Sequence, residues 1–186
     1  GELRIKAIPE VLDYFSKEIE LKKETLYNCK MVQAQDGVSV ESDTLGALLY
    51  PLEGDTFALD MVIKPERYHE FGIALHVDKE LETGYFLRMN PKNQLVAWDM
   101  WPRGEQGRYQ WQIKGDVPYQ IETARKLPKA EEYRVHIIKE KDICVVYIND
   151  EIVLSTRMYN HKDGYAGIYV VQGNVKLIQY KEKRSE

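Results

Sequence analysis

The feature that most constrains this chain is an alternation of apolar and polar side chains with a period of two residues. Large apolar residues recur at every second position, as at Phe57, Leu59, Met61 and Ile63, and again at Phe71, Ile73, Leu75 and Val77. A period of two places successive side chains on opposite faces of an extended chain. The alternation therefore predicts β-strands, each with one face turned toward a core.

Further runs of the same kind continue to the end of the sequence. They have apolar residues at Tyr133, Val135 and Ile137, at Ile143, Val145 and Tyr147, at Ile152 and Leu154, and at Tyr165, Tyr169 and Val171. Turn-forming pairs separate them, at 54–55, 90–91, 149–150, 163–164 and 173–174. Many short strands spaced about 8 to 12 residues apart are typical of a sandwich or barrel. We therefore expect an all-β fold, a sandwich or barrel rather than a parallel α/β sheet.

Two local signals are sharper than the rest. Asn149 and Asp150 tolerate positive φ and stand between two apolar runs, which predicts a hairpin with a two-residue loop. Residues 9–15 begin with a proline and carry apolar residues at helical spacing, which predicts one short N-terminal helix.

Length and charge limit the possible organisation and partners. The 186 residues suit a single sandwich domain spanning 1–186, with 44% hydrophobic residues to form its core. A net charge of −4 argues against nucleic acid as a partner, and no apolar run approaches the roughly 20 residues of a membrane helix. The sequence does not start with a signal segment, which says little about compartment, so a cytoplasmic and a secreted location both stay open. Cys29 and Cys144 are expected to be buried thiols, with a bridge between strands as the alternative.

The sequence contains no recognisable catalytic, cofactor or metal motif. Some sandwich-fold glucanases carry an E-x-D-x-x-E run, which aligns three acids on one face of a strand. Two stretches begin this run, at 41–43 and 53–55, but Gly46 and Ala58 stand where each third acid should be. Both stretches are expected in turns, where small acidic residues are common. We therefore expect no catalytic residue, no cofactor and no metal site of EF-hand type.

Aromatic and planar polar side chains gather in one segment that interrupts the strand pattern. Flat rings can stack on sugar rings, while Arg side chains donate hydrogen bonds to hydroxyl groups. The candidate carbohydrate-binding residues are Trp101, Arg103, Arg108, Tyr109 and Trp111. The alternative is that these rings only hold the loop in place. Trp98 shares its strand face with Val96 and Met100 and is expected in the core.

The stretch from Tyr147 to Tyr159 resembles the closing hairpin of the C-terminal β-sandwich in family 32 glycoside hydrolases, the invertase- and levanase-like enzymes. Segments 71–78, 84–89 and 164–170 resemble neighbouring strands of that domain, so the likeness covers about residues 55–180. It implies a two-sheet antiparallel β-sandwich, a concanavalin A-like jelly roll. This domain would support a catalytic propeller, which would be its partner in a longer parent chain.

The catalytic motifs of that family are missing from the present sequence. Met89-Asn90-Pro91 lacks the Asp of the nucleophile motif, and neither cysteine follows a Glu. The resemblance thus implies a non-catalytic accessory domain of a glycoside hydrolase, one that could also contact carbohydrate. Two alternatives stay open, an independent carbohydrate-binding module and a sandwich-fold glycosidase whose acids converge only in space.

Overall fold

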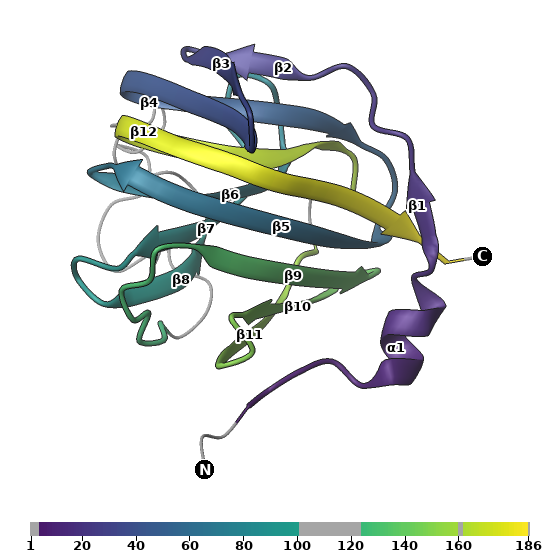
Figure 1. Cartoon of the computed structure of the whole chain (residues 1–186). Helices are drawn as coiled ribbons and strands as arrows, with labels where there is room; N and C mark the ends of the chain where they lie inside the picture. Colours follow the sequence, from purple (N-terminus) through teal and green to yellow (C-terminus); the bar gives the residue numbers. More distant parts are fainter. Residues whose placement is uncertain (1–3, 101–123, 160–161, 186) are drawn as a thin grey trace, which may run out of the picture.

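The computed structural model describes residues 4–100, 124–159 and 162–185. Within them lie one helix and twelve strands (Figure 1). The elements are α1 (Pro9–Tyr14), β1 (Lys17–Ile19), β2 (Thr25–Tyr27), β3 (Lys30–Ala34), β4 (Gly37–Leu52), β5 (Thr56–Arg67), β6 (Glu70–Val77), β7 (Tyr85–Asn90), β8 (Leu95–Asp99), β9 (Tyr133–Glu140), β10 (Ile143–Ile148), β11 (Ile152–Arg157) and β12 (Gly164–Arg184). The predicted all-β class is confirmed, as is the short helix that begins at Pro9.

The strands form two antiparallel sheets that are joined through β12. The first sheet runs β11-β10-β9-β5 and continues into the C-terminal half of β12, which pairs with β5 from Asn174 onward. The second sheet runs β8-β7-β6 and continues into the N-terminal half of β12, where Tyr165 to Val171 pair with β6. Figure 1 shows β12 in yellow beside β4 and β5, with β6, β7 and β8 in the layer behind.

The long strand β4 accompanies β12 through both sheets. It pairs with β12 from Leu52 to Val38, and it carries β2 beside the second sheet and β3 beside the first. Both strands change register where they cross between the sheets, between Val171 and Gly173 on β12. Gln172 there has φ 48°, and such an irregularity increases the local twist of a strand.

The main core lies between the sheets and is formed by the inward faces of both. Trp98 is fully buried in it, as the sequence predicted. On β10, however, the inward residues are Cys144, Val146 and Ile148, and on β12 they include Ala166, Ile168 and Val170. The run that begins at Ile143 therefore faces away from the main core. The run that begins at Tyr165 packs instead in a second apolar cluster, where Tyr169 and Val171 are buried. Both strands carry apolar side chains on both faces, so alternation alone did not identify the inward one.

Two predicted turns differ in detail from the structure. Asn149 and Asp150 have φ 53° and 58°, and Glu151 N donates to Ile148 O at 3.0 Å, which confirms the hairpin. Its loop has three residues rather than two, since Ile148 pairs with Ile152. The stretch 41–43 lies inside β4 and not in a turn, whereas 53–55 does connect two strands. Both cysteines are free thiols.

The N-terminal residues 4–19, here called the N-terminal strap, lie against the outer face of the first sheet. Ile5 N donates to Asp150 O at 2.7 Å, and β1 pairs with the end of β12. Between these contacts, Phe15 is buried against Ala58 and Ile138. No described helix is long and apolar enough to cross a membrane.

Candidate functional site

The outer face of the second sheet carries the most unusual side chains among the described residues. One row runs across six strands in register, through Tyr27, Ala47, Tyr169, Gly72, Arg88 and Ala97. Much of the face is apolar, with Leu45, Ala74, Phe86 and Val171 in a cluster separate from the main core. Among the buried residues described, charged side chains interrupt this apolar face at one place, which lies beside Arg88.

A buried ion cluster stands at that place and is built from four strands. Glu70 comes from β6, Arg88 from β7, Asp99 from β8 and Tyr169 from β12. Arg88 donates from Nε to Glu70 Oε1 at 3.1 Å and from Nη2 to Glu70 Oε2 at 2.5 Å, and its Nη1 lies 3.6 Å from Asp99 Oδ2. The Tyr169 hydroxyl donates to Glu70 Oε1 at 3.1 Å.

The cluster is nearly closed to solvent, and Arg88 is its most accessible member. The Arg88 side chain is 17% exposed, against 5% for Glu70 and 1% for Asp99. Burial acts to lower the pKa of Arg88, but the hydrogen bonds and negative charge of Glu70 outweigh it and raise that pKa. Burial and the neighbouring Glu70 charge raise the pKa of the Tyr169 phenol well above its usual range. Arg88 is thus a permanent cation and Tyr169 a neutral donor.

A glycine makes this arrangement possible. Gly72 lies directly opposite Arg88 and directly opposite Tyr169 on its two neighbouring strands. A Cβ atom at position 72 would lie 2.9 Å from Tyr169 Cε1 and 1.9 Å from Leu87 O. The Tyr169 ring therefore occupies space that a larger residue would need, and from there its hydroxyl reaches Glu70.

The cluster offers planar hydrogen-bonding groups at fixed positions. A guanidinium paired with a carboxylate in two-point geometry is rigid and directional. Such donors and acceptors match the alternating hydroxyl groups of a sugar. Glu70 accepts hydrogen bonds from Arg88, and Asp99 lies beside the same cation. Because these groups hold one another in place, the cluster is suited to binding a polar ligand.

This cluster was not predicted from the sequence, although the sequence contains a signal for it. Glu70, Arg88 and Asp99 are single charged residues at the ends or in the middle of otherwise apolar strand runs. The five residues that the sequence did propose, Trp101, Arg103, Arg108, Tyr109 and Trp111, lie outside the described residues. Asp99 nevertheless stands two residues before Trp101, so the chain leaves the cluster directly into that segment.

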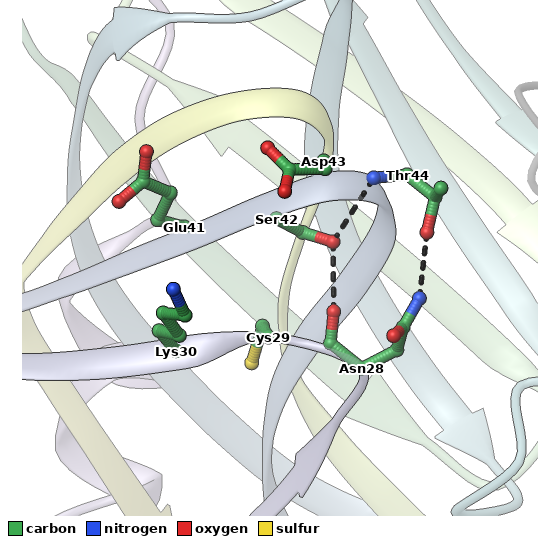
Figure 2. A pocket seen from close by; sticks show the side chains of 7 residues that line it. All are labelled: Asn28, Cys29, Lys30, Glu41, Ser42, Asp43 and Thr44. Carbon is green, nitrogen blue, oxygen red and sulfur yellow. Dashed lines mark hydrogen bonds between the residues drawn. The ribbon is translucent and has the colours of Figure 1, made fainter.

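A pocket of about 450 Å³ opens at the bend of β4 (Figure 2). Its lining is polar, and Ser42 Oγ donates to Asn28 O at 2.7 Å while Asn28 Nδ2 donates to Thr44 Oγ1 at 2.6 Å. Glu41 and Asp43 line it too, so the interrupted acidic run of the sequence lies at a cavity. Among the described residues, no group of three or more potential ligands could hold a metal ion, here or elsewhere.

Comparison with known proteins shows likeness in structure without close likeness in sequence. No family model matches the sequence, and no curated protein matches it. The structure is similar to the carbohydrate-binding module CBM66 from Bacillus subtilis, with TM-score 0.71, 17% identity, and 88% of this chain and 96% of that chain covered. It is also similar to a Bacillus subtilis protein of unknown function with a galectin-like fold, with TM-score 0.63, 10% identity and coverage of 92% and 97%.

A third similar structure belongs to a larger protein. This is the sucrose-6-phosphate hydrolase from Lactobacillus gasseri, with TM-score 0.53 and 10% identity. The likeness covers 96% of the present chain but only 30% of the hydrolase. At these identities the comparisons establish the fold, an antiparallel sandwich of galectin-like form.

Proposed function

We propose that this domain binds carbohydrate through the outer face of its second sheet and has no catalytic activity of its own. The observation that carries the proposal is the buried cluster of Arg88, Glu70, Asp99 and Tyr169, which holds two-point hydrogen-bonding groups on a sheet face. The similarity to CBM66 supports the same reading, because that structure is a carbohydrate-binding module.

Arg88 forms the accessible edge of the cluster. Arg88 has five N–H groups, of which Nε and Nη2 are used by Glu70. A ligand hydroxyl could accept a hydrogen bond from one of the remaining N–H groups of Arg88, which is the most accessible member of the cluster. Because the guanidinium is already fixed by Glu70, little side-chain entropy is lost when the ligand binds.

The segment that follows β8 is expected to complete this site. Trp101 and Trp111 would supply the rings for stacking, and Arg103, Arg108 and Tyr109 would supply further polar contacts. The cluster and this segment are adjacent in the chain, because Asp99 ends β8 and Trp101 comes two residues later.

The proposed setting is that of an accessory domain in a family 32-like glycoside hydrolase, beside a catalytic propeller. The resemblance of the 147–159 stretch to the closing hairpin of that family supports this setting. So does the structural likeness to about a third of a sucrose-6-phosphate hydrolase. The sequence of a longer parent chain, searched for a W-M-N-D-P-N-G-like motif, would test the setting separately from sugar binding.

Calorimetric titration with levan, inulin, mannan, galactan and β-glucan tests the binding proposal directly. At least one of these should bind, and Arg88→Lys should weaken its binding at least about tenfold, since lysine cannot reproduce the two-point geometry. Tyr169→Phe, which removes only one hydroxyl, should weaken it less.

Arg157→Lys is the matched control, because Arg157 forms an exposed ion pair with Asp142 on the other sheet. Its affinity should equal that of the wild type. Unchanged binding by folded Arg88→Lys would contradict the placement of the site, and failure of all five glycans to bind would contradict the function. Hydrolysis of any of them, abolished by Glu70→Gln or Asp99→Asn, would contradict the non-catalytic role.

A further inference from the structure

The first sheet ends in a strand with one open side. β11 is the outermost strand of that sheet and pairs with β10 without any change of register (Figure 1). No described residue pairs with its other side, here called the β11 edge. An unpaired edge presents a row of N–H and C=O groups that can pair with another chain. The β11 edge is therefore a candidate interaction surface.

The β11 edge differs from the other described edges of the two sheets. Native proteins usually protect an edge by keeping it short, by placing charge or proline on it, or by covering it. β1 and β2 have three residues each, β3 begins with the exposed Lys30, and β8 is bonded through Val96 to Arg125. β11 has six residues, and those from Ile152 to Thr156 carry no charge. Its edge thus lacks the protection that the other described edges have.

The hydrogen-bond pattern indicates which backbone groups face the β11 edge. Met158 N donates to Asp142 O at 2.7 Å, just beyond the paired part of β10 and β11. In an antiparallel pair, hydrogen-bonded and non-hydrogen-bonded positions alternate along each strand. Leu154 therefore bonds to β10, as Met158 does toward Asp142, whereas Val153 and Ser155 direct their N–H and C=O groups to the β11 edge.

We propose that two copies of this chain associate through the β11 edge, with the two β11 strands antiparallel and Leu154 opposite itself on a two-fold axis. In this register Val153 of each copy lies opposite Ser155 of the other. Each of these pairs can exchange two backbone hydrogen bonds, because both residues face the edge. The same surface is used on both copies, so the contact closes as a dimer.

Charge favours this register over its neighbours. It places Glu151 opposite Arg157 of the other copy at both ends of the contact. Glu151 is exposed, and Arg157 is 56% exposed and uses Nη1 for Asp142, so its other N–H groups can reach a second carboxylate. A shift by two positions is the smallest that keeps the sheet faces matched. It would place Arg157 opposite the uncharged Val153 or Asn149 instead.

The outer faces of the joined sheets match as well. On β10, Tyr147 stands opposite Val153 and Val145 stands opposite Ser155, and all but Ser155 are partly buried apolar residues. Pairing would continue the row of Tyr147 and Val153 into Ser155 and Val145 of the second copy. Side chains that become neighbours across strands in this way stabilise a sheet. The proposal does not depend on carbohydrate binding, because it uses no residue of the Arg88 cluster.

Sedimentation velocity over a range of protein concentrations tests whether the dimer forms. One pair of six-residue strands is expected to bury less than the roughly 1,600 Å² of a standard interface, so the association should be weak and reversible. We expect a monomer–dimer equilibrium with a Kd of about 10–100 μM, measured between about 5 and about 500 μM protein.

Charge reversal tests the register. Glu151→Arg and Arg157→Glu each bring like charges together at both ends of the contact, so each should raise the Kd at least about tenfold. The double variant restores opposite charges and should return the Kd to within about threefold of the wild type. Lys30→Glu, a charge reversal at the β3 edge, is the matched control and should leave the Kd unchanged. Arg88→Lys should also dimerise as the wild type does.

Hydrogen exchange at low and high protein concentration locates the contact. The amides of Val153 and Ser155 should exchange freely in the monomer and become protected in the dimer, whereas that of Leu154 should be protected in both. A chain that stays monomeric at about 500 μM would show that the proposal is wrong. So would a dimer that is insensitive to Glu151→Arg, a double variant as weak as the single ones, or protection that appears on β3 instead of β11.

Discussion

The ring of Tyr169 lies so close to Gly72 that a Cβ atom at position 72 would be 2.9 Å from its Cε1 atom. The two residues are directly opposed on β12 and β6, and Arg88 is opposed to Gly72 on the far side. The packing of one aromatic ring against one glycine thus helps to set the position of the hydroxyl that reaches Glu70. This relationship can be tested without any ligand.

Gly72→Ala is expected to destabilise the domain by about 1–3 kcal/mol, because the added methyl group overlaps both the Tyr169 ring and the Leu87 carbonyl. Urea unfolding followed by fluorescence would measure the change. Val32→Ala, at a strand position that is 60% exposed, should change stability by no more than about 0.5 kcal/mol. If both substitutions change the free energy of unfolding equally, a small shift of the Tyr169 ring and the Leu87 carbonyl relieves the crowding at Gly72.

Removing the cation of the buried cluster should be more costly. Arg88→Met leaves Glu70 and Asp99 without their guanidinium, and breaking a buried ion pair from one side costs about 3–5 kcal/mol. Arg157→Met removes an exposed cation from Asp142 and should cost no more than about 1 kcal/mol. Chemical denaturation of both variants at the same pH makes the comparison. A small effect at Arg88 would mean that water reaches the two carboxylates.

Burial opposes ionisation of Asp60, but hydrogen bonds and positive charge from His136 and Lys183 outweigh it and lower the pKa of that carboxyl to about 2. The low pKa of Asp60 therefore predicts how stability depends on pH. Because its folded-state pKa is about 2 and its usual value is 3.8, the carboxylate stabilises the fold above about pH 4. That contribution, about 2 kcal/mol, is lost as the pH falls toward 2. Asp60→Asn should therefore be less stable than the wild type at pH 6, and the difference should shrink at pH 2. Thermal unfolding at both values would measure it, with exposed Asp13→Asn as the control.

The two cysteines should differ in reactivity toward a thiol reagent. Burial raises the pKa of Cys144 to about 12, and its side chain is fully buried. Cys29 is only partly buried, although burial raises its pKa too. In the folded protein iodoacetamide should modify Cys29 first and leave Cys144 intact, as peptide mass spectrometry would show. Cys29→Ser should then show almost no labelling until denaturant is added.

The sequence predicted the sandwich well because its strongest signals are local. Trp98 in the core, the helix at Pro9 and the turn at Asn149 each depend on a few neighbouring residues. It failed where a strand is apolar on both faces, as β10 is, because period-two alternation then has no preferred side. It also assigned 41–43 to a turn, whereas the acids there lie at the bend of a sixteen-residue strand.

The candidate site could be predicted only in part, for a different reason. Glu70, Arg88 and Asp99 lie on three separate strands, and their meeting depends on the register of β6, β7 and β8. A single sequence does not encode that register in any local pattern. The contacts of Asp60 with His136 and Lys183 were missed for the same reason, since these residues are up to 123 positions apart in the chain.

The long strand β12 also determines when this domain can fold. It supplies the central partner of both sheets, with β5 and β6 on one side and β4 on the other, yet it follows the other eleven described strands in the chain. On a ribosome, β4, β5 and β6 would be synthesised well before the strand that joins them, and their edges would stay open until Gly164–Arg184 emerged. We thus expect the two sheets to assemble late in synthesis and in one cooperative step. Chaperones that shield unpaired strands would have their greatest effect before that point.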